Sequence, residues 1–240
     1  MSSLKAIFFD LDNTLVDCRT ADIRTYEILS ILARKKQVNI NTPQLIQCFQ
    51  HLLIDVPFDP EGIIPVHPWR TGLWEKALHN QEIDDPILAE HLDTAFHSER
   101  LAYYTFIPGT QKMLDTLLPA YTGVIITNGD SEIQRPKLAA CNAGKYFHHI
   151  VVGGEEPFEK PDPSIFYTAC DLAKCCPDEA IMIGDSLKAD IQGGLDSGLA
   201  ATIWVNPENK EMPEQGPIPH KQVVSILELP SIINTLEKDN

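Results

Sequence analysis

The segment KAIFFDLDNT, residues 5–14, joins an apolar run to a pair of carboxylates. Residues 5–9 are rich in Phe and Ile, which is typical of a buried parallel strand, and Asp10 follows at its carboxyl end. Asp12 comes two residues later. Two like charges this close at a buried strand end repel each other unless a cation or a proton lies between them. The segment therefore predicts a first strand that delivers two carboxylates to a charged site.

Strand and helix patterns alternate in the second half of the chain, beyond Pro108. Strands are expected at residues 121–127, 149–152, 180–184 and 201–205. Helices are expected at residues 110–118, beyond 131, at 163–173, 187–197 and 224–236. Such alternation means a parallel sheet with helices on both faces. The predicted fold class is α/β, with a Rossmann-like parallel sheet core.

Between these two parts, residues 20–104 show helical patterns and no comparable strand. Leu88, Leu92 and Phe96, for example, recur at helical spacing. The sequence predicts an inserted all-helical domain at residues 19–105 and a core domain of residues 1–18 and 106–240. Four prolines between residues 51 and 68 predict a loop there between helices.

Composition limits the classes of partner. The 240 residues include 19 Lys and Arg against 34 Asp and Glu, a formal net charge of −15, which disfavours nucleic acid and anionic membranes. The six cysteines lack the spacing of a zinc site and are expected to be free thiols. We find no signal-peptide pattern and no apolar run long enough to span a membrane, so a cytoplasmic protein is expected, as a monomer or weak homodimer.

Polar side chains follow several of the predicted strands, where open α/β sheets bind ligands. A carboxylate such as Asp10 is a plausible nucleophile toward phosphorus, but both groups are anionic, so a divalent cation must screen them. Asp10 and Asp185 could supply oxygen ligands for Mg²⁺, with Asp190 orienting them. Lys160 and the Thr127 hydroxyl would then hold the phosphoryl oxygens.

Each of these residues also has a simpler reading. Asp185 could cap the helix that follows it, Thr127 could be a turn residue, and Lys160 could be solvated like most lysines. The order of the motifs favours chemistry: DxDxT at residues 10–14, Thr127, Lys160 followed by proline, and GDSxxxD at residues 184–190. Over the whole chain this set resembles the haloacid dehalogenase superfamily, whose aspartate-nucleophile phosphatases carry a helical cap after the first strand.

The resemblance implies a role for each matching residue. Asp10 would form an aspartyl phosphate, and Asp12 would protonate the leaving alkoxide and later activate water. Dehalogenases lack the second Asp, so this chain resembles the phosphatases. Thr127 and Lys160 would bind the phosphoryl group with the backbone amides of Leu11, Asp12 and Asn128, and Mg²⁺ would be held by Asp10, the carbonyl of Asp12 and Asp185.

A closer resemblance, to the neuraminate phosphatases of this superfamily, rests on RTGLWEKA (70–77), VVGGE (151–155), EKPDPSIF (159–166) and GDSLKADIQGGL (184–195). It implies a small-molecule phosphate ester as the partner, N-acylneuraminate 9-phosphate. The carboxylate of that sugar needs a cation from the cap, and Arg70 is preferred among its basic residues because it lies in RTGLWEKA. An ion pair within the cap or at the surface is an equal alternative for Arg70. The other candidates are Arg24, Arg34, Lys35, Lys36, Lys76 and Arg100. Other candidate functions are a phosphatase of nucleoside monophosphates or phosphoglycolate, and a catalytically idle binding or regulatory protein.

Overall fold

The computed structural model describes residues 3–58 and 64–238. They form two compact units, one made of the residues up to Cys18 and from Thr105 onward, and the other of Arg19–Tyr104. The first unit is a parallel α/β core and the second is an all-helical insert, the cap unit. The predicted fold class is therefore confirmed.

The core contains one six-stranded sheet with the strand order β3-β2-β1-β4-β5-β6, in which every neighbouring pair is parallel. The strands are β1 (Ala6–Phe9), β2 (Thr122–Thr127), β3 (His149–Val152), β4 (Ala180–Gly184), β5 (Ala201–Val205) and β6 (Lys221–Val223). All residues of β1, β4 and β5 are buried, as expected for strands covered by helices on both faces.

The strand order creates a reversal point beside β1. The chain proceeds from β1 to β2 and β3 on one side, then returns to β4 on the other side of β1. Phe9, the last residue of β1, pairs with both Ile125 of β2 and Ile183 of β4. The residues that follow Phe9 therefore lie beside the ends of β2 and β4, at the position where open α/β sheets bind ligands.

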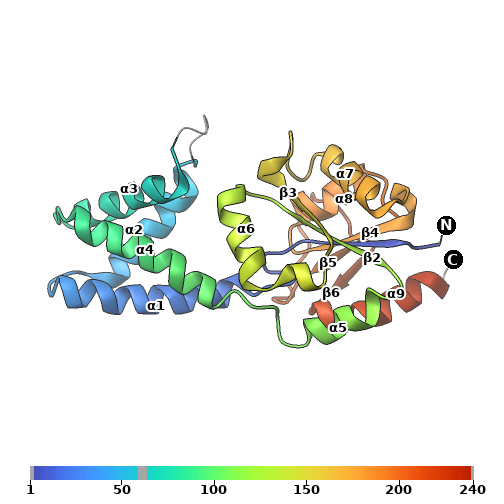
Figure 1. Ribbon diagram of the computed structural model, residues 1–240, viewed down its shortest axis with the longest axis horizontal. Coiled ribbons are helices and arrows are strands. Elements are labelled where there is room, and N and C mark those ends of the chain that lie inside the picture. The colour runs from blue at the N-terminus through green and yellow to red at the C-terminus, as the bar shows by residue number, and fades with distance from the viewer. Residues whose placement is uncertain (1–2, 59–63, 239–240) are drawn as a thin grey trace. The chain divides into compact units, whose positions relative to one another are not determined.

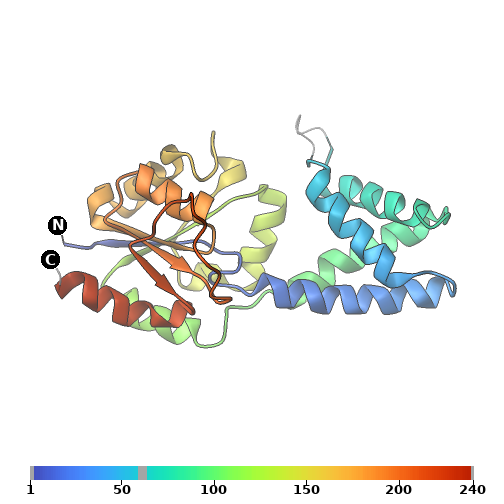
Figure 2. The same cartoon turned by 180° about the vertical axis from the view of Figure 1, so that it is seen from behind.

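Helices cover both faces of this sheet. They are α5 (Thr110–Leu117), α6 (Ser131–Ala140), α7 (Pro163–Ala173), α8 (Gly193–Asp196) and α9 (Leu229–Lys238). Helices α5 and α9 lie side by side on one face, and α7 and α8 lie together on the other (Figures 1 and 2). Phe166 of α7, for example, packs in one buried cluster with Phe8 of β1 and Val124 of β2.

The cap unit has its own core. Its helices are α1 (Cys18–Lys36), α2 (Thr42–Asp55), α3 (Val66–His79) and α4 (Pro86–Ala102). The ring of Trp74 stacks on Phe49 with centroids 3.5 Å apart, and Phe96 meets Phe49 edge-on. The side chains of Asn41 and Asp85 cap α2 and α4 by accepting backbone N–H groups.

The loop predicted at residues 51–68 was too long. Helix α2 continues to Asp55 and α3 begins at Val66, while residues 59–63 of the predicted loop lie outside the described residues. Pro68 is the third residue of α3, where the first-turn N–H has no acceptor within the helix, so proline is tolerated.

Two predictions near the C-terminal ends of the core also need correction. The helix expected at residues 224–236 begins only at Leu229, because residues 226–228 form a 3₁₀ turn before it. Residues 221–223 pair with β5 as a sixth strand that was not expected. The helix expected at residues 187–197 starts as a π-helix, Leu187–Gln192, before α8. A strand of three residues shows too little alternation to be recognised in a sequence.

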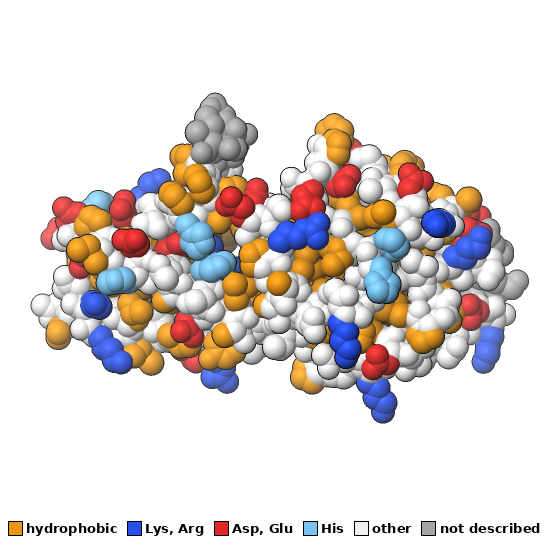
Figure 3. All heavy atoms as spheres, viewed as in Figure 1, with side chains coloured by type: hydrophobic (Ala, Val, Ile, Leu, Met, Phe, Trp, Pro, Cys, Tyr) orange, Lys and Arg blue, Asp and Glu red, His pale blue; other side chains and the backbone are white. Residues whose placement is uncertain are grey.

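The surface is mixed in charge. On the face shown in Figure 3, acidic and basic side chains are interspersed with hydrophobic ones. In the part of the chain that the structure describes, no helix is long and apolar enough to cross a membrane.

Candidate active site

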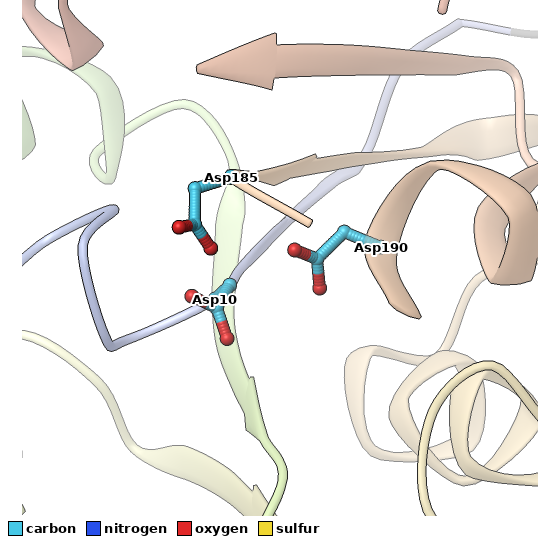
Figure 4. A group of neighbouring side chains, drawn as sticks. All are labelled: Asp10, Asp185 and Asp190. Carbon is cyan, nitrogen blue, oxygen red and sulfur yellow. The ribbon is translucent and has the colours of Figure 1, made fainter. Parts of the chain in front are cut away.

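Asp10, Asp185 and Asp190 form an acidic cluster at the carboxyl end of the sheet (Figure 4). One oxygen from each carboxylate lies within 4.8 Å of the others. Asp10 follows β1 directly, and its N–H donates to the carbonyl of Ile183 at 2.9 Å, so the end of β1 is bound to β4. Asp185 follows β4 in the same way. Parallel pairing thus explains why residues 175 positions apart in the sequence meet.

Lys160 places a buried ammonium group in this cluster. Its Nζ donates to Asp10 Oδ1 at 2.8 Å, to Asp190 Oδ1 at 2.7 Å and to the carbonyl of Ile126 at 2.6 Å. These three acceptors match the three N–H bonds of a lysine. A direct hydrogen bond from Lys160 to a phosphoryl oxygen would have to replace one of them.

The buried charges shift one another's ionisation. Burial raises the pKa of Asp10 to about 7, helped by the negative charge of Asp190 and opposed by Lys160. Burial also raises the pKa of Asp190. For Lys160, burial lowers the pKa, but Asp10 and Asp190 outweigh that effect and raise it above its ordinary value. When all three carboxylates are ionised, they and the one ammonium leave two negative charges in excess, so this ionised state of the site favours a further cation.

The backbone around β4 fits the acidic side chains closely. The Ser186 N–H donates to Asp190 Oδ2 at 2.9 Å, and the indole N–H of Trp204 donates to the Asp185 carbonyl at 2.9 Å. A Cβ on Gly184 would lie 2.1 Å from Asp190 Oδ2, so glycine is needed for the carboxylate to approach the strand. Both oxygens of Asp190 are thus engaged by protein donors, which suits its predicted role of orienting the other carboxylates.

Asp12 is surrounded by three donors that were not predicted from the sequence. Lys137 Nζ donates to its Oδ2 at 2.7 Å and Gln134 Nε2 donates to the same oxygen at 3.1 Å. The Cys18 thiol donates to its Oδ1 at 2.9 Å. Burial acts to raise the pKa of Asp12, but the Lys137 charge and these hydrogen bonds lower it below its ordinary value. The spacing of Gln134 and Lys137, three residues apart on a helix, was the only signal in the sequence.

Thr127 and Asn128 end β2 beside Asp10 and have different partners. Thr127 Oγ1 is buried and lies 2.5 Å from Gln134 Nε2. The Asn128 side chain binds the backbone of Lys160 through two hydrogen bonds. The Leu11 carbonyl accepts the N–H groups of residues 15 and 16, which turns the chain back after Asp10. Their binding of a phosphoryl group stays a prediction.

Arg70 lies in the cap unit, on α3. Its side chain is 7% exposed, forms an ion pair with Asp93 of α4, and lies over the ring of Phe96 at 5.0 Å. His67 also contacts Asp93, at 2.8 Å. Arg70 therefore has an ion-pair partner within the cap unit, and its contact with a substrate carboxylate stays a prediction.

A parallel α/β core, an inserted helical cap and carboxylates at the ends of β1 and β4 together define the class of enzyme. Residues 4–198 match the family model of haloacid dehalogenase-like hydrolases, and the chain belongs to this family. It is a hydrolase of phosphoric monoesters, with an acidic site of the kind that binds a divalent metal.

Particular relatives are similar over nearly the full length. The N-acylneuraminate-9-phosphatases of Rattus norvegicus and Homo sapiens are 38% and 36% identical, with 99% of this chain and 96% of each relative covered. The magnesium-bound structure of the HAD-hydrolase YfnB from Bacillus subtilis has a TM-score of 0.73 at 23% identity, over 97% of this chain and 100% of that one. This last likeness concerns the fold.

Proposed function

We propose that this protein is a Mg²⁺-dependent phosphatase in which Asp10 is the nucleophile. The observation that carries the proposal is the contact between the Lys160 ammonium and both Asp10 and Asp190, beside Asp185. A solvated lysine would not be buried, and a helix-capping aspartate would not need two further carboxylates within 4.8 Å. The arrangement suits a site that handles several negative charges at once.

The first step transfers the phosphoryl group to the protein. An oxygen of Asp10 attacks phosphorus, the ester P–O bond breaks, and its electron pair goes to the leaving alkoxide. Asp12 donates the proton that the alkoxide takes up. Thr127 and the backbone amides of Leu11, Asp12 and Asn128 orient the phosphoryl oxygens, and Lys160 compensates negative charge beside Asp10.

The second step regenerates the enzyme. Asp12, now ionised, accepts a proton from water as the water oxygen attacks phosphorus. The bond between phosphorus and the Asp10 oxygen breaks, which releases inorganic phosphate and restores the carboxylate. The lowered pKa of Asp12 favours the ionised form that this step needs and opposes the protonated form that the first step needs.

The carboxylates fit Mg²⁺ because they offer hard oxygen ligands around an excess of negative charge. Asp10, the backbone carbonyl of Asp12 and Asp185 would hold the ion, and Asp190 would orient them. When bound, the ion screens the repulsion between Asp10 and the phosphate.

For the substrate we propose N-acylneuraminate 9-phosphate. The proposal is supported by the similarity to the N-acylneuraminate-9-phosphatases of Rattus norvegicus and Homo sapiens, which extends over 99% of this chain. The segment RTGLWEKA of the cap unit supports it as well. The cap unit would supply a cation for the sugar carboxylate, with Arg70 as the candidate.

The test is phosphate release from a panel of esters with and without Mg²⁺. The panel contains N-acylneuraminate 9-phosphate, nucleoside monophosphates, phosphoglycolate and an aryl phosphate. We expect the highest kcat/KM on the first and loss of activity after chelation. A higher kcat/KM on a nucleotide or phosphoglycolate would contradict the proposed substrate. Activity that survives exhaustive chelation would contradict the proposed dependence on Mg²⁺.

A further inference from the structure

The carboxylate of Asp12 is held from two directions within the core unit. Lys137 and Gln134 both donate to its Oδ2, and Cys18 donates to its Oδ1. The Asp12 side chain is 30% exposed, so part of the carboxylate can also contact solvent or a substrate. Three donors on one carboxylate restrict it to a single orientation.

The two nitrogen donors come from one buried face of α6. Gln134 and Lys137 are three residues apart and are 2% and 6% exposed. Asp130 caps the start of this helix by accepting the Glu132 N–H at 2.7 Å, which fixes the first turn. Lysine is almost never buried without a partner, and the Asp12 carboxylate is one partner of the buried Lys137 ammonium.

Gln134 also connects Asp12 to the end of β2. Its Nε2 lies 3.1 Å from Asp12 Oδ2 and 2.5 Å from Thr127 Oγ1. One amide group therefore contacts both Asp12, which is proposed to act as acid and then as base, and the Thr127 hydroxyl, which is proposed to bind the phosphoryl group. A shift of α6 would move both contacts together.

We propose that Lys137 and Gln134 are positioning residues that hold the carboxylate of Asp12 at the orientation its proton transfers require. This proposal rests on the role of Asp12 in the proposed function. A catalytic group that is fixed before the substrate arrives loses less freedom in the transition state, and small displacements of such groups reduce rates strongly. Lys137 supplies the stronger contact because its charge assists the hydrogen bond.

The test compares Lys137→Met with Lys112→Met, which removes an exposed lysine of α5 in the same unit. Each variant is assayed on N-acylneuraminate 9-phosphate and on an aryl phosphate, whose phenolate leaves with little help from an acid. For Lys137→Met we expect kcat on the sugar phosphate to fall about 10- to 100-fold, with KM and the aryl phosphate rate little changed. Lys112→Met should match the wild type on both.

Two further variants separate positioning from general damage. Lys137→Arg keeps the charge and should restore most of the sugar phosphate rate. In Asp12→Asn, adding Lys137→Met should cause no further loss, because the group to be positioned is already gone. Equal losses on both substrates, or a rise in KM on both, would overturn the proposal, since they would mean that Lys137 binds phosphate or supports the fold. If Lys137→Met does not fold, Lys137→Gln is used in its place.

A crystal structure of Lys137→Met tests the proposal without a measurement of turnover. We expect the Asp12 side chain to occupy more than one rotamer while Asp10 stays in place; an unmoved Asp12 carboxylate would overturn the proposal. If the wild type releases phosphate from no ester, the proposed function fails, and this structure still decides whether Lys137 orients Asp12.

Discussion

Asn128 and Lys160 are joined by two reciprocal hydrogen bonds. Asn128 Nδ2 donates to the Lys160 carbonyl at 2.8 Å, and the Lys160 N–H donates to Asn128 Oδ1 at 3.0 Å. The pair connects the end of β2 to the loop before α7, 32 residues further along the chain. It fixes the backbone from which the Lys160 side chain reaches Asp10.

Asn128→Ala should therefore disturb Lys160 without touching its side chain. Two backbone groups lose their partners, so we expect the free energy of unfolding to fall by about 1–3 kcal/mol and kcat/KM to fall on every phosphate ester. Urea unfolding and steady-state kinetics measure the two effects. Asn80→Ala, at an exposed position in the cap unit, should change neither. A selective loss on one ester would contradict this role for Asn128.

Asp10→Asn should abolish turnover and keep the fold. The amide is close in size to the carboxylate but is not a nucleophile, while Lys160 retains Asp190 and the Ile126 carbonyl as acceptors. Because burial raises the pKa of Asp10 to about 7, the ionised form of Asp10 lowers the stability of the folded protein at pH 8. In metal-free protein at that pH, the variant should melt at or above the Tm of the wild type. Wild-type activity in the folded variant would disprove Asp10 as the nucleophile.

The sequence was sufficient to predict five of the six strands that the structure describes and the residues that close the strands at the site. Asp10, Thr127 and Asp185 follow apolar runs, and parallel pairing necessarily brings such ends to one edge. The contacts of Lys137 and Gln134 with Asp12 were not predictable, because they depend on the angle at which α6 crosses that edge. The pairing of Arg70 with Asp93 was also not predictable from the sequence, because it depends on how α3 packs against α4.

The third prediction concerns stability against pH. The pKa of Asp10 is about 7 in the folded protein against 3.8 ordinarily, so the folded state binds this proton more tightly. The resulting stabilisation is complete below about pH 4 and is lost as pH rises through about 7. Asp190 shifts in the same direction, and the lowered pKa of Asp12 affects stability only in more acidic solution. Between pH 5 and 7, the titration of Asp10 should lower the free energy of unfolding of the metal-free protein by up to about 1.4 kcal/mol per pH unit.

Magnesium should reverse this trend, because the cation and the proton compete for Asp10. A ligand that binds only the folded state raises its stability, so Mg²⁺ should raise Tm more at pH 8 than at pH 5.5. The difference should vanish in Asp185→Asn, which removes one carboxylate of the cluster. Equal Tm shifts at both pH values would mean that Mg²⁺ binds away from these carboxylates.

The last prediction concerns Arg70 and separates its two interpretations. In Arg70→Met, Asp93 is 4% exposed and keeps, among the residues that the structure describes, only the contact with the His67 ring, so breaking the buried pair should cost about 3–5 kcal/mol of unfolding free energy. Arg24→Met is the matched control, because its pair with Glu27 is more than half exposed at both side chains and should contribute about 0–0.5 kcal/mol. If Arg70 also binds the sugar carboxylate, kcat/KM of the folded variant should fall roughly 10- to 150-fold on N-acylneuraminate 9-phosphate and hardly at all on an aryl phosphate. A loss of stability with equal or no loss on the two substrates would assign Arg70 to Asp93 alone, and the carboxylate would then need another cation.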